Sequence, residues 1–246
     1  MALADHLPAL RHRNFRLLWL SQMVSMAGSM MQSAAILWHV SLLVPASKRG
    51  LALGMTGAVR IVPIVAFSIV SGVVADHFDR RKVMLVTQSL MALAAAALAW
   101  LSFSGVRSLW PVYLLAGLSS AFWAFDGPSR QSLIPNLVPR EHLPNAISLN
   151  TIMFEVASIT GPALGGLVIA WGGVGWAYAA NAVSFLFVIV ALLMMRDVAA
   201  RPEGISGGVN LHAALEGLRF VFRTPLIRAT MLLDFFATFF LSLIHI

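Results

Sequence analysis

The sequence has no cysteine and few charged residues, and both shortages narrow what the protein can be. Without cysteine there is no disulfide framework, zinc knuckle or thiol nucleophile. Only 11% of the residues are charged, whereas a soluble domain has about a quarter. Hydrophobic residues make up 59% of the 246, and the mean hydropathy is +0.83. This composition predicts an all-α membrane protein that crosses the bilayer several times.

The common motifs of soluble enzymes are also lacking. The sequence contains no phosphate-binding G-x-x-x-x-G-K, no H-E-x-x-H and no G-x-S-x-G. We therefore expect no enzyme activity, no metal site and no cofactor. The net charge of +7 does not indicate a nucleic-acid partner, because the cations fall in short links between apolar runs.

Seven apolar runs are long enough to cross a bilayer, since a helix needs about 20 residues to span the hydrocarbon core. They cover residues 15–40, 51–75, 83–104, 111–130, 146–171, 176–195 and 226 onward. Most of the 17 Lys and Arg residues lie in the N-terminal segment and in alternate links. This asymmetry predicts a multi-pass protein with a cytoplasmic N-terminus.

The pattern divides the chain into three parts. We expect a six-helix bundle over 1–196, a cytoplasmic linker over 197–225 and the start of a seventh helix over 226–246. Within the linker, Leu211, Leu215 and Leu218 fall on one face of a short amphipathic helix. Such a helix lies in the membrane interface or packs on a partner domain.

Ionisable side chains inside the spans need a role, because each costs a few kcal/mol in hydrocarbon. Asp126 and Arg130 are four residues apart and form a candidate gating pair, or an ion pair that only shapes the helix end. Glu155, Arg60 and Asp234 are candidates for proton coupling or substrate binding. A structural pair between Glu155 and Arg60 is the alternative.

The link between the second and third runs carries the densest motif. Its marked positions are Gly72, Asp76, Arg80, Arg81 and Lys82. Gly72 would let a neighbouring helix approach closely. Asp76 ends a helix, where an anion opposes the helix dipole and needs a partner. Arg130 is the best candidate, and the pair would form a latch at the inner face.

The fifth run contains the segment Gly161-Pro162-Ala163-Leu164-Gly165-Gly166. Pro162 removes a backbone hydrogen bond and bends the helix. Gly161 and Gly165 form a small-xxx-small face, which favours very close packing on a neighbour. The segment therefore predicts a bent, tightly packed helix.

These motifs together resemble the major facilitator superfamily of secondary transporters. The 72–82 link is similar to the signature loop between the second and third helices, although His77 and Asp79 stand where Arg and Gly are common. The stretches 124–150 and 216–220 resemble the branch of enterobactin-exporter-like efflux proteins. The 161–166 segment, with Gly161, Pro162, Gly165 and Gly166, is similar to the fifth-helix motif of antiporters.

The resemblance implies a secondary active transporter in the inner or plasma membrane. It would export small molecules of drug or siderophore type by alternating access, with protons as the coupling ion. Six spans, a long link and a new span are what the front half of a two-bundle carrier shows, so a C-terminal six-helix half is expected as partner. A non-transporting scaffold subunit or an inactive half-transporter is the alternative.

The last residues of the chain, LSLIHI, also resemble a translated sequencing adaptor. We therefore expect the genuine sequence of this fragment to end near Phe240.

Overall fold

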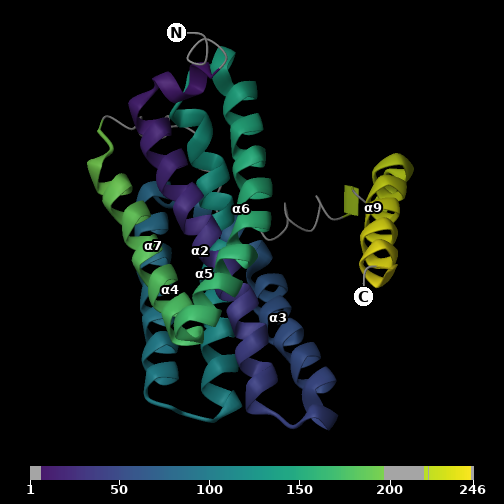
Figure 1. The fold of residues 1–246 in the computed structure, drawn as a ribbon. Coiled ribbons are helices and arrows are strands. Elements are labelled where there is room, and N and C mark those ends of the chain that lie inside the picture. Colours follow the sequence, from purple (N-terminus) through teal and green to yellow (C-terminus); the bar gives the residue numbers. More distant parts are fainter. Residues whose placement is uncertain (1–6, 197–218, 221, 245–246) are drawn as a thin grey trace. The chain divides into compact units, whose positions relative to one another are not determined.

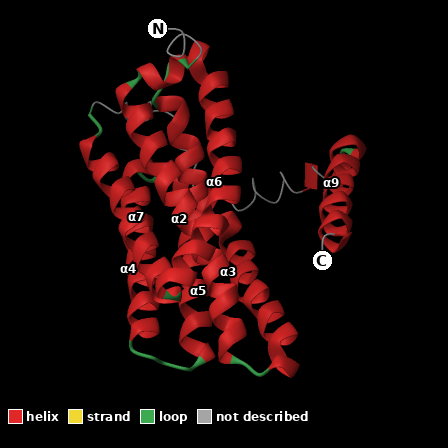
Figure 2. Cartoon of the chain, in the orientation of Figure 1, coloured by secondary structure: helices red, strands yellow, loops and turns green. Residues whose placement is uncertain are grey.

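The structure, a computed structural model, describes residues 7–196, 219–220 and 222–244, without the side chains of residues 69, 76, 235 and 238–244. Throughout this described part the regular structure is helical, and it contains no strand (Figure 2). The chain divides into two compact units, Met1–Arg201 and Pro202–Ile246.

Six long helices build the first unit (Figure 1). They are α2 (Arg13–Leu43), α3 (Arg49–His77), α4 (Arg80–Phe103), α5 (Leu109–Leu133), α6 (Leu143–Gly172) and α7 (Val174–Met194). Each helix coincides with one predicted apolar run, and the boundaries differ by only a few residues. The all-α membrane architecture expected from the sequence is therefore confirmed.

Length and composition alone mark four helical stretches of the described residues as able to cross a membrane. They are Ala46–Ser68, Arg80–Phe103, Arg140–Gly172 and Val174–Met194. Helices α2 and α5 are less apolar because they carry polar side chains that the bundle buries. Gln22, Gln32, Asp126 and Arg130 are all less than 10% exposed.

The helices of the first unit follow one another through short links. One 3₁₀ turn, η1 (Pro8–Arg11), precedes α2, and another, η2 (Ala46–Lys48), precedes α3. Two more, η3 (Ile134–Asn136) and η4 (Arg140–His142), fill the link between α5 and α6. Turn η2 thus lies in the link between α2 and α3, and η3 and η4 lie in the link between α5 and α6.

The bundle core lies along the contacts of α2 with α6 and α7, of α3 with α5, and of α4 with α5 and α7. An apolar cluster including Phe15, Met84 and Leu192 fills the end where α2 begins, called here the N-terminal end. A second cluster, including Leu98 and Tyr178, fills the opposite end. The interior at both ends of the bundle is therefore apolar.

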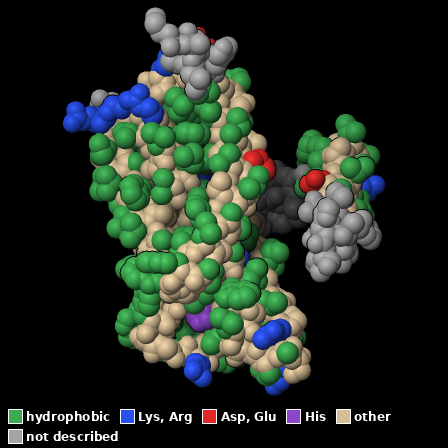
Figure 3. All heavy atoms as spheres, in the orientation of Figure 1, with side chains coloured by type: hydrophobic (Ala, Val, Ile, Leu, Met, Phe, Trp, Pro, Cys, Tyr) green, Lys and Arg blue, Asp and Glu red, His purple; other side chains and the backbone are tan. Residues whose placement is uncertain are grey.

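The outer surface of the six-helix unit is unusually apolar. Figure 3 shows hydrophobic side chains over its sides, with Lys and Arg mostly near its two ends. Leu93, Trp100, Leu167 and Trp171 are each at least 66% exposed. A surface of this kind is stable where lipid replaces water, because hydrocarbon does not penalise exposed apolar side chains.

The second unit contains α9 (Pro225–Ile244), which begins where the seventh apolar run was predicted. Its described side chains include the exposed Leu226, Met231 and Leu233. The expected amphipathic helix falls largely on residues 197–218, outside the described residues. The predicted linker boundaries are therefore left as predictions.

Candidate functional site

The motif link joins α3 to α4 at the N-terminal end of the bundle. Helix α3 ends at His77 and α4 begins at Arg80. Asp79 is the N-cap of α4, and its Oδ1 accepts a hydrogen bond of 2.9 Å from the backbone N–H of Arg81. A carboxylate at this position satisfies a free donor and interacts favourably with the positive end of the helix dipole.

The two arginines that follow bind the ends of two other helices. Arg80 Nη1 donates to the backbone oxygen of Ser132 at 2.9 Å, in the last turn of α5. Arg81 Nη2 donates to the backbone oxygen of Leu193 at 3.2 Å, in the last turn of α7. Lys82 is exposed. Arg80 and Arg81 thus connect the start of α4 to the ends of α5 and α7, a role that the sequence did not predict.

No helix of this unit approaches Gly72 closely in the described part of the chain, and a contact there with another partner stays a prediction. A Cβ placed on Gly72 would meet no heavy atom within 4 Å among the described residues. The reason is that α3 packs chiefly along α5 and touches little else here. The side chain of Asp76 lies outside the described part, so its latch with Arg130 stays a prediction.

Asp126 and Arg130 are both buried in α5, which continues through Pro128. Asp126 Oδ1 accepts hydrogen bonds from Thr87 Oγ1 at 3.0 Å and from Gln88 Nε2 at 2.9 Å, both on α4. Arg130 Nη1 donates to Gln22 Oε1 on α2 at 3.1 Å. The pair therefore links α5 to two different helices instead of closing on itself.

The fifth-helix segment packs closely on α2. A Cβ on Gly161 would lie 2.5 Å from Met30 Cβ and 2.7 Å from the backbone oxygen of Ala27. A Cβ on Gly165 would lie 3.2 Å from Met31 Cγ. Pro162 is inside α6 on its exposed side, and Gly166 has open space where its Cβ would be. The predicted small-xxx-small contact is present.

A cavity of about 280 Å³ lies within the bundle, and all six helices line it. Arg60 of α3 lines this cavity and donates from Nη2 to Ser33 Oγ on α2 at 3.0 Å. Asn181 of α7, another lining residue, donates from Nδ2 to Gln32 Oε1 at 2.9 Å. The interior is therefore polar at a few points and apolar elsewhere.

Neither of the two remaining acidic candidates is among the residues that line that cavity. Glu155 is exposed near the middle of α6, and Asp234 is exposed on α9 of the second unit. No ion pair joins Glu155 to Arg60 in the part of the chain that the structure describes. The alternative of a structural Glu155–Arg60 pair is thus not found.

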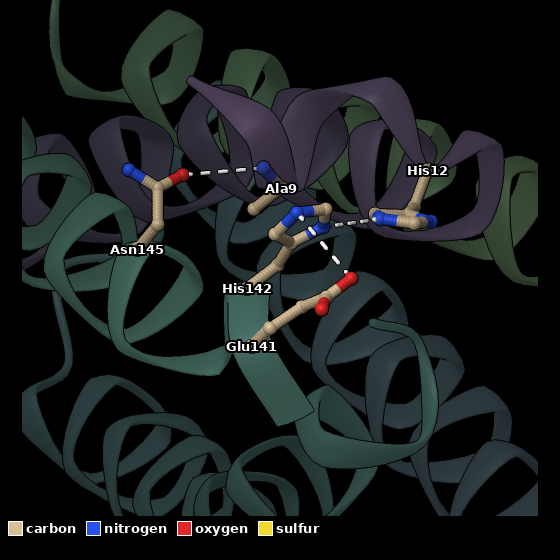
Figure 4. Close-up of polar contacts among 5 residues, drawn as sticks. All are labelled: Ala9, His12, Glu141, His142 and Asn145. Atoms are coloured by element: carbon tan, nitrogen blue, oxygen red, sulfur yellow. Dashed lines mark hydrogen bonds and ion pairs between the residues drawn. The ribbon is translucent and has the colours of Figure 1, made fainter. Parts of the chain in front are cut away.

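Histidine contacts also escaped the sequence reasoning. At the N-terminal end, His12 Nε2 and His142 Nδ1 lie 2.8 Å apart, and Glu141 Oε1 is 3.9 Å from His142 Nε2 (Figure 4). Beside them, the backbone N–H of Ala9 donates to Asn145 Oδ1 at 3.2 Å. These contacts hold the segment before α2 against the start of α6.

Comparisons with known proteins agree with this arrangement. Residues 4–246 match the family described as transmembrane secretion effector, a family of the major facilitator superfamily (MFS). The uncharacterized MFS-type transporter YfiS of Bacillus subtilis is 29% identical, over 86% of this chain and 50% of its own length. No solved structure matches.

Exporters are among the similar proteins. The enterobactin exporter EntS of Shigella boydii serotype 18 is 28% identical over 90% of this chain and 52% of its own length. EntS of Escherichia coli O1:K1 matches to the same extent. The chain thus spans about half the length of the curated relatives it matches. With its helices and motifs, the chain belongs to the transmembrane secretion effector family of MFS transporters and is a multi-pass membrane protein, not an enzyme.

Proposed function

We propose that this chain is the N-terminal half of a proton-coupled exporter of small molecules in the inner membrane. The observation that carries the proposal is the cavity lined by all six helices, in a chain similar to named exporters. Small-molecule sites are typically concave, mostly apolar and equipped with a few polar groups. A scaffold subunit would not require such a cavity, so the family and the geometry favour transport.

Alternating access requires one end of the bundle to open and close. In this proposal the N-terminal end faces the cytoplasm, in line with the excess of Lys and Arg in its links. Arg80 and Arg81 hold the ends of α5 and α7 in register with the start of α4. Asp76 and Gly72, next to them, would meet the C-terminal half in the closed state. The open space at Gly72 leaves room for that contact.

Glu155 is proposed as the residue that carries the coupling proton. Its support is its place near the middle of α6, where an exposed carboxylate needs water or a partner from the other half. The close α2–α6 packing at Gly161 connects the helix that carries Glu155 to the cavity wall.

The test is efflux by the full-length protein in energised inverted vesicles, with and without a proton gradient. The native protein should accumulate substrate only when the gradient is present, and Glu155→Gln should abolish accumulation while leaving passive exchange. Glu141→Gln, a carboxamide substitution at an exposed acid in η4, is the matched control and should stay active. Accumulation that ignores the proton gradient would disprove the coupling, and full activity of Glu155→Gln would remove that residue from it.

A further inference from the structure

Arg60 is the one charged residue among the described residues that line the central cavity. It lies on α3, 27 positions from the α2 hydroxyl of Ser33 that it contacts. Its side chain is partly buried. A guanidinium is always protonated, so the cavity wall carries a permanent positive charge.

That charge is poorly compensated within the six-helix unit. A guanidinium has five N–H donors, and Ser33 Oγ accepts from Nη2 at 3.0 Å. No Asp or Glu is among the lining residues, and no ion pair to Arg60 occurs in the described part of the chain. Removing a charge from water without a counter-charge is costly, and such a group interacts strongly with an anion that enters.

The other polar groups of the wall are uncharged. Ser33 Oγ accepts the hydrogen bond from Arg60, and Asn181 Nδ2 donates to Gln32 Oε1. The remaining wall is mostly apolar, with Met26, Met30, Met91, Trp123, Phe154 and Phe185.

We propose that this cavity binds an amphiphilic organic anion, with its carboxylate on Arg60 and its apolar body against the methionines and aromatic rings. The inference rests on the proposed function, because it names the substrate class of the same cavity. Arg60 supplies planar paired donors, which match the two oxygens of a carboxylate. A cationic compound of the same size would be repelled by Arg60, since like charges in a desolvated site disfavour binding.

The experiment compares two probes of nearly the same shape, one an anionic carboxylate and the other a neutral carboxamide. The full-length protein in nanodiscs of zwitterionic lipid is titrated calorimetrically with 2-naphthoate and with the neutral 2-naphthamide. The native protein should bind the carboxylate at least about 10-fold more tightly, as expected for a charge-assisted pair. Arg60→Gln should bind both probes equally, whereas Arg107→Gln, which removes an exposed cation between α4 and α5, should keep the preference.

The outcomes separate this inference from the proposed function. Equal binding of the two probes by the native protein, or an unchanged preference in Arg60→Gln, would overturn it. Should Arg60→Gln bind neither probe, Arg60→Lys decides: a retained carboxylate preference supports the inference, and its loss overturns it. A carboxylate preference together with efflux that ignores the proton gradient would refute only the coupled export. Proton-driven efflux with equal probe binding would refute only the substrate class.

Discussion

Arg81 donates a hydrogen bond from Nη2 to the backbone oxygen of Leu193, 3.2 Å away and 112 positions later in the chain. The contact joins the first turn of α4 to the last turn of α7, where carbonyl groups have no partner within their own helix. Arg80 makes the equivalent contact with Ser132 at the end of α5. Two neighbouring cations therefore fix three helix ends at one side of the bundle.

Removing one of these cations should loosen that end. Arg81→Ala is expected to lower the free energy of unfolding by about 1 kcal/mol, since it deletes a charge-assisted bond to a helix C-terminus. Thermal unfolding in detergent measures the change. Lys82→Ala, which removes an exposed cation one position on, is the control and should leave the unfolding temperature unchanged. An equal loss in both variants would show that total charge, not this contact, matters.

Adding a methyl group to α6 should test its packing on α2. Gly161→Ala places a Cβ 2.5 Å from Met30 Cβ and is expected to cost about 1–3 kcal/mol through overpacking. Gly166→Ala, five positions along the same helix, meets open space and should be neutral or slightly stabilising. Unfolding in denaturant compares the two. A tolerated Gly161→Ala would mean that the helices separate without loss.

Removing the buried charge of Asp126 should destabilise the protein more than removing a neutral hydrogen-bond donor to it. Asp126→Asn should cost about 3 kcal/mol, because Arg130, a buried cation, then loses the acidic neighbour that the described side chains give it. Thr87→Val removes one neutral donor to the same carboxylate and should cost about 1 kcal/mol. Both are read from thermal unfolding in nanodiscs. If Thr87→Val proves the more damaging of the two, charge compensation is not what holds this region.

The His12–His142 contact can be measured by a double-mutant cycle. His12→Ala and His142→Ala should each destabilise the bundle, and the double variant should lose less than the sum by about 1 kcal/mol. Limited proteolysis of the segment before α2 gives an independent measurement, since the same contact holds that segment on α6. Additive effects would show that the two rings do not interact.

The number, order and approximate bounds of the six bundle helices followed from the sequence because bilayer thickness sets the length of an apolar run. The close approach at Gly161 followed too, since two small residues four apart leave a groove that a neighbour fills. Gly72 has the same residue type yet meets nothing here. Residue type makes such contact possible, but which helix lies opposite depends on the tertiary arrangement.

The partners of the polar residues were the least predictable part. Asp126 and Arg130 have the spacing of a helical ion pair, yet each makes its hydrogen bonds to another helix. In hydrocarbon a buried polar group bonds to whatever donor or acceptor packs against it, and no local pattern encodes that neighbour. Arg60 was recognised as unusual from its position in a span, while its contact with Ser33 needed the fold.

The contacts of Arg80 and Arg81 have a consequence for how this protein can evolve. Their acceptors are main-chain oxygens, which every amino acid supplies, so substitution at positions 132 and 193 leaves the acceptor in place. The constraint thus falls on the two donors alone. We therefore expect homologues to keep the two arginines and to vary at positions 132 and 193, without covariation between the paired positions.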